Sequence, residues 1–312
     1  MSMIANFKDI VPYLNDEEKC RDLFERLRWP DGTECPRCGH KEHIYKLRGK
    51  STRPGVYKCG SCRRPFTVTV NSVFEGTRIP LSSWLYAIYL MCSSKKGVSA
   101  KQLERELGIT YKSAWFMCHR VRLAMTQPPL IGKLGGTVEV DETYIGGKTH
   151  KLHNWRKKKA TVLTLIERGG KVRTFPMPNT KKGYLQSLIR LNVEETAHIM
   201  TDSYRSYRGL DKHFASHESV DHSKEYVRGI IHTNFAESYH SLLKRSIFGT
   251  HHHISKKHLP RYLREREFCW NLRHATDGTR TMAAIAGAKG KRLMYREPLR
   301  KRKSGHARDS QT

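Results

Sequence analysis

The sequence predicts a mixed α/β protein that is preceded by a small metal-binding module and a helical domain. Three observations support this fold class. Two cysteine pairs lie within residues 35–62, a run of helical periodicity covers residues 81–125, and strand-like and helix-like segments alternate between residues 137 and 273. Such alternation is typical of a sheet with helices packed against it. The 312 residues leave room for two or three domains of roughly 100–200 residues each.

Composition points to a polyanionic partner. The chain has 58 Lys and Arg against 29 Asp and Glu, a formal net charge of +29. A surplus of this size favours DNA or RNA, and an anionic membrane surface fits less well. We find no apolar run of about 18 residues and no signal peptide at the start, so we expect a cytoplasmic, nucleoid-associated protein. In a reducing compartment, closely spaced cysteines are better interpreted as metal ligands than as disulfides.

The N-terminal part is expected to hold a helical lead-in over residues 1–34 and a zinc ribbon over residues 35–75. Cys35-Pro-Arg-Cys38 and Cys59-Gly-Ser-Cys62 are separated by 20 residues, the spacing of two zinc knuckles. Four thiolates complete a tetrahedral site and leave no position for water, so we expect one structural Zn²⁺. Short alternating runs at residues 42–47 and 66–70 suggest strands. The other four cysteines lie on apolar helical faces and are expected to be buried.

Residues 80–127 are predicted to form a helix-turn-helix domain. Gly108 would end one short helix, and Thr110 would cap a second helix that begins at Tyr111. Residues 81–91 would supply the third packing helix. An ordinary helical hairpin is the alternative, but the net charge and the neighbouring cysteine pairs favour DNA binding. The side chains left free for a DNA groove would be those of Thr110, Tyr111, Lys112, Ser113 and Arg120.

Proline and glycine residues between 128 and 136 mark a linker to the α/β part, which is expected over residues 137–275. Three antiparallel strands, a helix, a fourth strand and further helices indicate a mixed sheet. The strands are predicted at residues 137–145, 160–167, 171–177, 197–202 and 215–221, and the helices at residues 180–192, 233–246 and 256–273. Residues 288–312 are basic and poor in apolar side chains, so we expect a disordered tail.

Acidic side chains lie in or at the end of two predicted strands. Residues two apart in a strand share a face, so Glu139 and Asp141 point the same way and Glu142 points the opposite way. Asp141 follows a valine-rich, half-buried run, and Asp202 closes the apolar run of residues 198–202. A carboxylate beside a core is costly unless it is paired or binds a metal. We therefore expect Asp141 and Asp202 to hold divalent cations.

The helix-like run of residues 234–244 carries further candidates. Asn234 and Glu237 are three residues apart and share a face, and Lys244 follows Glu237 by almost two full turns. Glu237 would complete the metal site with Asn234 and Glu139 in support, and Lys244 would hold a DNA phosphate. Oxygen ligands favour Mg²⁺ or Mn²⁺, and two such ions would activate water or a 3′-hydroxyl and stabilise the leaving oxygen. Taken singly, each acid also fits an ordinary surface residue.

Basic residues beyond this helix complete the predicted DNA contacts. His251-His-His253 follows Gly249 in a segment without acidic partners, which favours a polar DNA-facing loop over a metal site. A second basic stretch, with His153, Asn154 and Lys157–Lys159, fits either a DNA contact or solvent-exposed residues that precede the next strand. The contacts predicted after the helix are Arg245, His251, His252, Lys256 and Lys257.

The chain resembles the DDE transposases of bacterial insertion sequences, in the zinc-ribbon group related to the eukaryotic Merlin elements. The resemblance covers roughly residues 15–275. It rests on the cysteine quartet and on the runs Val138–Gly147, Thr201–Tyr204, His232–Arg245 and Gly249–Leu259. It implies an RNase-H-like catalytic core, Mg²⁺-dependent strand cleavage and strand transfer, and recognition of the element's terminal inverted repeats.

Carried over position by position, the resemblance implies a triad of Asp141, Asp202 and Glu237, with Lys244 as its basic companion. Some relatives have asparagine as the third member, so Asn234 is the alternative to Glu237. Double-stranded DNA, both transposon ends and target, would be the partner, and joining two ends implies a homodimer or a higher oligomer. Two other functions fit parts of the sequence: a zinc-ribbon and helix-turn-helix regulator or decayed transposase, and a structure-specific nuclease whose products stop at cleavage.

Overall fold

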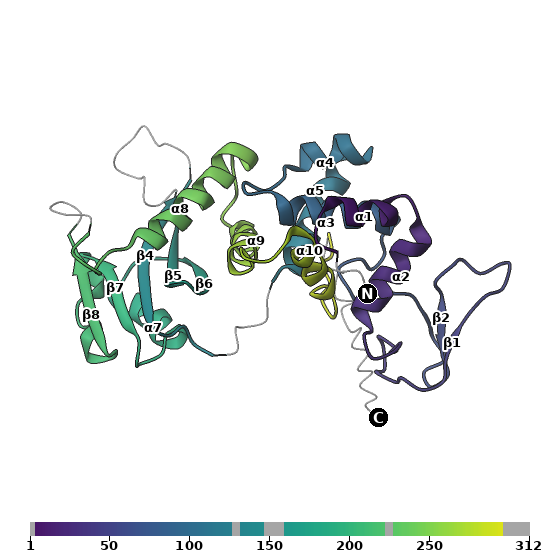
Figure 1. Cartoon of the computed structure of the whole chain (residues 1–312), viewed down its shortest axis with the longest axis horizontal. Coiled ribbons are helices and arrows are strands. Elements are labelled where there is room, and N and C mark those ends of the chain that lie inside the picture. Colours follow the sequence, from purple (N-terminus) through teal and green to yellow (C-terminus); the bar gives the residue numbers. More distant parts are fainter. Residues whose placement is uncertain (1–3, 127–131, 147–158, 222–226, 296–312) are drawn as a thin grey trace, which may run out of the picture.

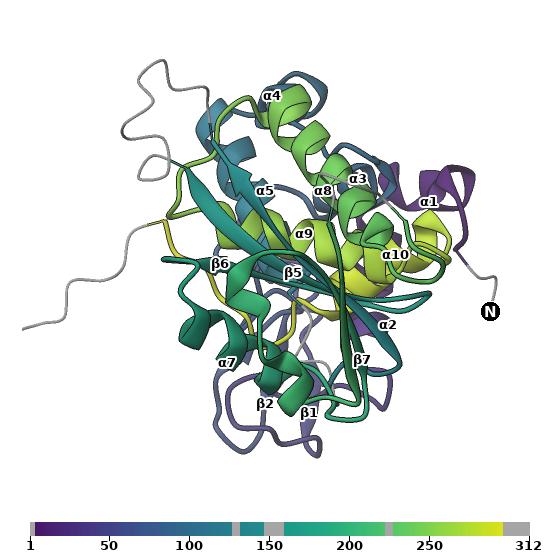
Figure 2. The ribbon, with the colours of Figure 1, turned by 90° about the vertical axis from the view of Figure 1, so that its left-hand side faces the viewer.

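The computed structural model describes residues 4–126, 132–146, 159–221 and 227–295. A five-stranded mixed sheet lies at one end of the molecule, a small three-stranded sheet lies at the other end, and helices fill the space between them (Figure 1). Figure 2 turns the end with the larger sheet toward the viewer. No helix in the described ranges is long and apolar enough to cross a lipid bilayer.

The larger sheet has the strand order β6-β5-β4-β7-β8, which confirms the predicted mixed sheet. Within this sheet, β5 pairs antiparallel with both β4 and β6, and β4, β7 and β8 run parallel to one another. The bounds of β4 and β5 agree with the sequence prediction. The strands are β4 (Thr137–Ile145), β5 (Ala160–Glu167), β6 (Val172–Met177), β7 (His198–Asp202) and β8 (Ser216–Val220).

The two faces of this sheet have separate cores. On one face, Val138 and Val140 pack with buried residues of α7 (Lys182–Asn192) and of the short 3₁₀ segments η2 (Arg205–Tyr207) and η3 (Leu210–Lys212). On the other face, strand residues pack with α8 (Asn234–Ser246) and α9 (Leu259–Asn271), which are joined through the π-helical segment η4 (Ile247–His251). Helix α9 begins three residues later than the sequence suggested.

The helical part is built around one continuous core that includes the smaller sheet. Its elements are α1 (Phe7–Leu14), α2 (Glu17–Arg28), α3 (Leu81–Ser93), α4 (Ala100–Leu107), α5 (Tyr111–Ala124) and, from the C-terminal end of the chain, α10 (Asp277–Ala286). The predicted lead-in, ribbon and helix-turn-helix segments therefore share one apolar interior, because their helices are too short to bury their apolar faces alone.

The start of the predicted disordered tail packs against this core, which corrects the prediction for residues 288–295. Ala288 is buried, and the backbone of Lys289 forms an isolated antiparallel β-bridge with Ser72. The ammonium group of Lys291 donates a hydrogen bond to the carbonyl oxygen of Ala124 at 3.1 Å. Backbone contacts of this kind are available to a basic segment and leave no trace in its hydropathy. Residues 296–312 lie outside the described residues.

The smaller sheet consists of β1 (Ile44–Lys46), β2 (Tyr57–Cys59) and β3 (Pro65–Phe66), all antiparallel. The strand predicted over residues 66–70 is wrong beyond Phe66, where the chain turns. The rings of Trp29, Tyr57 and Phe66 pack together with centroids 5.6–6.0 Å apart. This aromatic contact attaches the ribbon to α2.

Candidate active site

Asp141 and Asp202 occupy matching places on neighbouring strands. The parallel register of β4 and β7 pairs Val140 with Thr201, so Asp141 and Asp202 follow at the next position of each strand. Aligned residues of parallel strands point to the same face of a sheet. Both side chains are half-buried, and Asp202 is the last residue of its strand. The two strands therefore present a pair of carboxylates side by side on one face of the sheet.

Glu142 adds a third carboxylate to this region, which the sequence reasoning did not use. It accepts a hydrogen bond from the hydroxyl group of Tyr207, a buried residue of η2. Burial raises the pKa of Glu142 to about 7, and the negative charges of Asp202 and Asp141 act in the same direction. This charge coupling shows that the three carboxylates share one electrostatic environment. Glu142 leaves the strand on the face opposite Asp141, and only the fold brings Tyr207 to it.

His240 connects Asp141 to α8. Its Nδ1 atom lies 3.3 Å from Oδ2 of Asp141, and its Nε2 atom lies 2.8 Å from Oγ1 of Thr164 on β5. Asp141 and Thr164 are directly paired in the β4–β5 register, so one imidazole spans both strands. The sequence held a signal for this residue, because His240 falls between Glu237 and Lys244 on the same helical stripe.

Glu139 attaches the first turn of α8 to β4. Its side chain is completely buried, and its Oε2 atom accepts hydrogen bonds from the backbone N–H groups of Phe235 and Ala236 at 2.9 and 3.1 Å. The N-cap residue, Thr233, makes no side-chain capping bond. A carboxylate from the neighbouring strand therefore takes the place of the cap and interacts favourably with the positive end of the helix dipole.

Arg168 and His232 complete the surroundings of Glu139. Nε of Arg168 donates to Oε1 of Glu139 at 2.8 Å, and Nδ1 of His232 lies 3.1 Å from the same oxygen. Arg168 also donates to the carbonyl oxygens of Ile230 and His232 at 2.8 and 3.0 Å. The buried carboxylate and the guanidinium thus fix both the segment that enters α8 and the first turn of the helix.

The predicted helical candidates lie on this anchored helix. Asn234 is its first residue, Glu237 lies in its first turn, and Lys244 lies in its last turn, all exposed. Because His240 of the same stripe contacts Asp141, the stripe lies over the carboxylate face of β4. Across the described parts of the chain, only the four zinc-ribbon cysteines bring three or more potential metal ligands within 4.8 Å of one another. Glu237 is therefore not gathered with Asp141 and Asp202 that closely.

The donor set of this region fits a hard divalent cation. Asp141 and Asp202, which share one face of the sheet, are oxygen donors, the ligand type that Mg²⁺ and Mn²⁺ prefer. Burial is the largest cause of the raised pKa of Glu142, and the charges of Asp202 and Asp141 add to it; a bound cation would offset that added part. Ligands of a two-ion site are also spread over both ions, which lie about 3.5–4 Å apart, so they need not all lie within one coordination sphere.

The cysteine quartet has the geometry of a zinc site. The Sγ atoms of Cys35 and Cys62 are 3.7 Å apart, those of Cys38 and Cys59 are 3.6 Å apart, and all four lie within 4.8 Å of one another. A tetrahedral ion with Zn–S bonds of about 2.3 Å places its sulfurs about 3.8 Å apart. The four thiols therefore fit one structural Zn²⁺ without rearrangement.

The N-terminus of α5 agrees with the sequence prediction, and Arg120 differs from it. Oγ1 of Thr110 accepts a hydrogen bond from the backbone N–H of Ser113, which confirms the predicted cap. Tyr111 and Lys112 are exposed beside it. Arg120, by contrast, donates to the carbonyl oxygen of Glu75 at 3.1 Å and lies over the ring of Phe116. Arg120 is thus held against the protein and is not free for a DNA groove, because its helix position faces the 67–75 segment.

The opposite face of α5 packs on α9 through buried charges. Arg122 donates to Glu265 at 2.6 Å, and Arg266 donates to the other carboxylate oxygen of Glu265 at 2.6 Å. All three side chains are less than 10% exposed. Burial alone would raise the pKa of Glu265, but the charges of Arg122 and Arg266 lower it to about 2. A buried cluster of two arginines around one glutamate therefore joins α5 to α9.

His251 corrects the predicted DNA-facing loop. Its ring packs on Tyr262 with centroids 4.8 Å apart, and its Nε2 atom is buried. Burial lowers the pKa of His251 to about 4. The neighbours His252 and His253 are exposed, as are Lys256, Lys257 and Arg245. The segment thus faces two ways, because a π-helical turn rotates one histidine inward. His153, Asn154 and residues 157–158 of the other basic stretch lie outside the described residues.

The α5–α9 interface is expected to weaken in acid. Burial lowers the pKa of His119 to about 3, with the charges of Arg122, Arg261 and His258 acting in the same direction and that of Glu265 opposing them. The unfolded chain binds a proton below about pH 6.5 that the folded chain rejects, so stability is lost as the pH falls below that value. Between pH 7 and pH 5, His119 alone is expected to lower the free energy of unfolding by about 2 kcal/mol.

Urea unfolding followed by tryptophan fluorescence at the two pH values measures this effect, since Trp115 packs against His119. His119→Leu should remove about that share of the pH dependence. The exposed His252→Gln should leave it unchanged. An identical pH dependence in wild type and His119→Leu would contradict the prediction.

Comparison with known protein families agrees with this architecture. Residues 133–271 match the family described as the ISXO2-like transposase domain, and residues 15–65 match the transposase zinc-ribbon domain. The first match spans the larger sheet with α7, α8 and α9. The second spans α2 and the cysteine quartet. The carboxylates therefore lie within the first matched range and the thiols within the second.

Two curated relatives agree with these matches. The chain is 29% identical over 267 residues to the "Uncharacterized protein in transposable element ISH50" of Halobacterium salinarum, a match that covers 80% of this chain and 88% of the relative. It is 31% identical over 101 residues to the "Uncharacterized transposase-like protein" of Haemophilus influenzae, which covers 32% of this chain and 81% of the relative.

Proposed function

The chain belongs to the family of ISXO2-like insertion-sequence transposases, and on that premise we propose that it binds the terminal inverted repeats of its element and cleaves and joins DNA strands there. The observation that carries this proposal is the alignment of Asp141 and Asp202 on adjacent parallel strands, with the stripe of α8 over the same face. A relation to the Merlin elements, which rests on the sequence motifs, is part of the proposal.

The strand order supports an RNase-H-like core, with three antiparallel strands followed by two parallel ones and helices on both faces. Asp141 and Asp202 would hold Mg²⁺ or Mn²⁺, with Glu237, or alternatively Asn234, as the third ligand. The ions would activate the attacking hydroxyl and stabilise the leaving oxygen in an in-line displacement at phosphorus. His240 holds the Oδ2 side of Asp141, and Glu139 with Arg168 holds the helix that carries the third ligand.

Exposed side chains in two regions would bind the DNA. We propose that α4 and α5 form a helix-turn-helix unit, supported by the left-handed Gly108 at the end of α4 and the capped start of α5. Lys244, in the last turn of α8, would hold a phosphate near the carboxylates. Joining two ends requires two active sites, so we propose at least a dimer on DNA. The exposed candidates are Thr110, Tyr111, Lys112, Lys244, Arg245, His252, Lys256 and Lys257.

Asp202→Asn is expected to abolish strand cleavage and strand transfer. The loss should be on the order of a thousandfold, because an amide removes a charged ligand of the proposed cation site. The assay incubates the purified full-length protein with Mg²⁺ and DNA that carries the ends of its element, and it separates nicked and joined products. The matched control is Asp211→Asn, an exposed aspartate of η3, which should keep activity.

Three other outcomes would change the assignment. Equal activity of wild type and Asp202→Asn would refute the proposed site. Specific DNA binding without Mg²⁺-dependent chemistry would favour the regulator, and cleavage without joining would favour the nuclease. Comparison of Glu237→Gln with Asn234→Ala identifies the third ligand, since only the ligand's replacement should match the loss caused by Asp202→Asn.

A further inference from the structure

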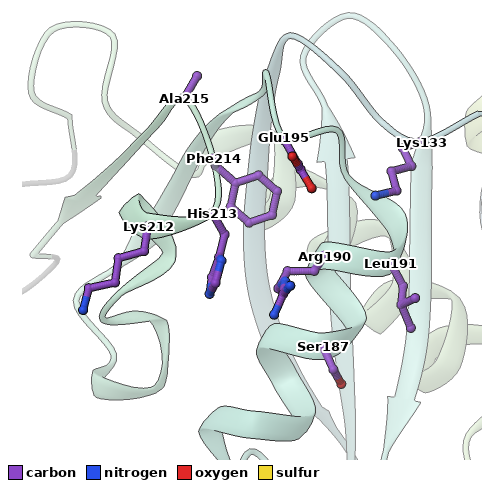
Figure 3. A pocket seen from close by; sticks show the side chains of 9 residues that line it. All are labelled: Lys133, Ser187, Arg190, Leu191, Glu195, Lys212, His213, Phe214 and Ala215. Carbon is purple, nitrogen blue, oxygen red and sulfur yellow. The ribbon is translucent and has the colours of Figure 1, made fainter.

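A cavity of about 670 Å³ lies at the N-terminal ends of the three parallel strands of the larger sheet (Figure 3). Lys133 precedes β4, Glu195 precedes β7, and Phe214 precedes β8. The C-terminal half of α7 forms the remaining wall. The volume falls within the range of about 300–1,000 Å³ that is typical of small-molecule sites. The complete lining is Lys133, Ser187, Arg190, Leu191, Glu195, Lys212, His213, Phe214 and Ala215.

This cavity is separate from the carboxylate site. Asp202 is the last residue of β7, whereas the cavity borders the start of the same strand. In the parallel register, the strand starts Thr137, His198 and Ser216 align with one another. A ligand in the cavity would therefore lie at the N-terminal end of β7, whereas Asp202 of the proposed cation site lies at its C-terminal end.

The lining carries an excess of positive charge. Lys133, Arg190 and Lys212 are exposed cations, and Glu195 is the single acid among the lining residues. Within the parts of the chain that the structure describes, no hydrogen bond or ion pair involves the side chains of these cations. Figure 3 shows Arg190 and His213 extending side by side, with Lys212 on one flank and Lys133 on the other. Cations without protein partners around a hollow favour an anionic ligand.

The frame of the cavity is fixed by backbone bonds. The strap, the segment of residues 132–136 that leads into β4 and carries Lys133, bonds to the end of α7 through Leu134. The N–H group of Leu134 donates to the carbonyl oxygen of Asn192, and the N–H group of Glu194 donates to the carbonyl oxygen of Leu134, each at 2.8 Å. Arg173 of β6 holds the side-chain oxygen of Asn192 at 2.7 Å. The backbone beside Lys133 and at the end of α7, which carries Arg190, is therefore held by contacts within the protein.

The lining also offers apolar surface. Phe214 belongs to the core between α7 and the sheet, and its ring faces the hollow (Figure 3). Leu191 on α7 is 71% exposed and lies beside the lining cations. A ligand with anionic groups and an apolar ring or sugar face would contact both kinds of surface, as a nucleotide unit of DNA does.

We propose that this cavity binds a phosphodiester and its nucleoside from a DNA strand, as a second DNA contact at the N-terminal ends of the parallel strands. The inference rests on the proposed function only in taking DNA as the polyanion, which the net charge of +29 favours. Arg190 and Lys212 hold the phosphate, Lys133 adds charge from the strap, and Leu191 with Phe214 contacts the sugar and base.

The test measures the binding of a fluorescent random-sequence duplex, and of the same sequence single-stranded, to the full-length protein over a range of salt concentrations. Arg190→Ala/Lys212→Ala should weaken binding on the order of tenfold at moderate salt. It should also reduce the slope of log affinity against log salt by about 1–2, because it removes two cations that neutralise phosphate charge. Both residues are exposed, so the variant should keep the wild-type thermal unfolding curve.

Lys8→Ala/Arg26→Ala is the matched control. These two cations line a hollow of about 510 Å³ on α1 and α2 that also contains Lys19, Asp9 and Asp22. Its two acids offset two of its three cations, whereas the cavity beside α7 has one acid for three cations. The control should leave affinity and salt slope close to wild type. An unchanged affinity and slope in the cavity variant, or equal losses in both variants, would overturn the proposal.

Two further results separate the alternatives. Titration with a free deoxynucleoside monophosphate, followed by calorimetry, should show weak binding that the cavity variant loses. If the free nucleotide binds tightly while DNA affinity does not depend on the cavity, a soluble nucleotide is the ligand and the DNA contact is refuted. Because DNA binding does not need catalysis, a cavity variant that binds like wild type refutes this inference alone. A wild-type protein that binds no DNA refutes the proposed function.

Discussion

Replacement of Cys59 by Ser is expected to unfold residues 35–66 and to remove the bound zinc. The three strands of the ribbon are only two or three residues long, too short to persist through their own hydrogen bonds. Binding of structural Zn²⁺ to small cysteine sites supplies about 10–16 kcal/mol at neutral pH, and most of it is folding free energy. The loss of one thiolate leaves an incomplete coordination sphere and exposes the aromatic contact between Trp29 and Tyr57.

Metal analysis and hydrogen exchange would measure this effect. The wild-type protein should contain one zinc, and Cys59→Ser should contain none, with rapid exchange confined to the ribbon and the adjoining turn of α2. The core around Val140 and Ile189 should keep its protection, because it shares no residue with the ribbon core. Cys20→Ala is the control, since Cys20 is buried outside the quartet and its loss should leave the zinc in place. A zinc-free Cys59→Ser ribbon with wild-type protection would contradict the prediction.

Glu139→Gln is expected to lower the free energy of unfolding of the α/β part by about 3–5 kcal/mol. Removal of one partner from a buried ion pair leaves the other charge, here Arg168, without compensation. The two backbone N–H groups at the start of α8 would also meet a neutral amide in place of a carboxylate. Glu139 is completely buried and the Arg168 side chain is 19% exposed, so solvent screens the remaining charge only in part.

The effect on α8 can be separated from general instability. Hydrogen exchange at the amides of Phe235 and Ala236 should accelerate more than exchange in β5, because those amides exchange a charged acceptor for a neutral one. The proposed strand cleavage should fall as the first turn of α8 loosens, since the same turn carries Asn234 and Glu237. Glu218→Gln, a half-buried glutamate of β8, is the control and should change stability by no more than about 0.5 kcal/mol. A Glu139→Gln variant as stable as this control would show that the buried pair contributes nothing net.

The candidate site could be predicted from the sequence where a local pattern carries the information. Strand periodicity placed Glu139 and Asp141 on one face and Glu142 on the other, and helical spacing placed Glu237 and Lys244 on one stripe. Neither pattern indicated that Glu139 would cap α8, because Glu139 lies almost a hundred residues before that helix and no local spacing relates the two. Tyr207 and Arg168 were missed for the same reason, since each reaches its carboxylate across a long separation in the chain.

Corrections fall where tertiary contacts outweigh local character. Arg120 was predicted to face DNA because the packing of the helix-turn-helix would leave it free, and His251 because its segment lacks acidic partners. Neighbouring elements instead supply a carbonyl acceptor for Arg120 and an aromatic ring for His251. The segment from Ala288 has a polar composition, but its backbone and lysine side chains bond to Asn71 and Ala124. Burial of these groups depends on partners that lie far away along the chain.

The sequence by itself determined the zinc quartet, the strands and helices, and the acidic and basic candidates, because these depend on spacing, periodicity and residue type within short windows. Only the tertiary structure decided which carboxylates share an environment, which charge anchors α8, and where cations without protein partners surround a cavity. These features depend on the register of β4, β7 and β8 and on the packing of α7 and α8. Register and packing are set by the whole core, and no single segment encodes them.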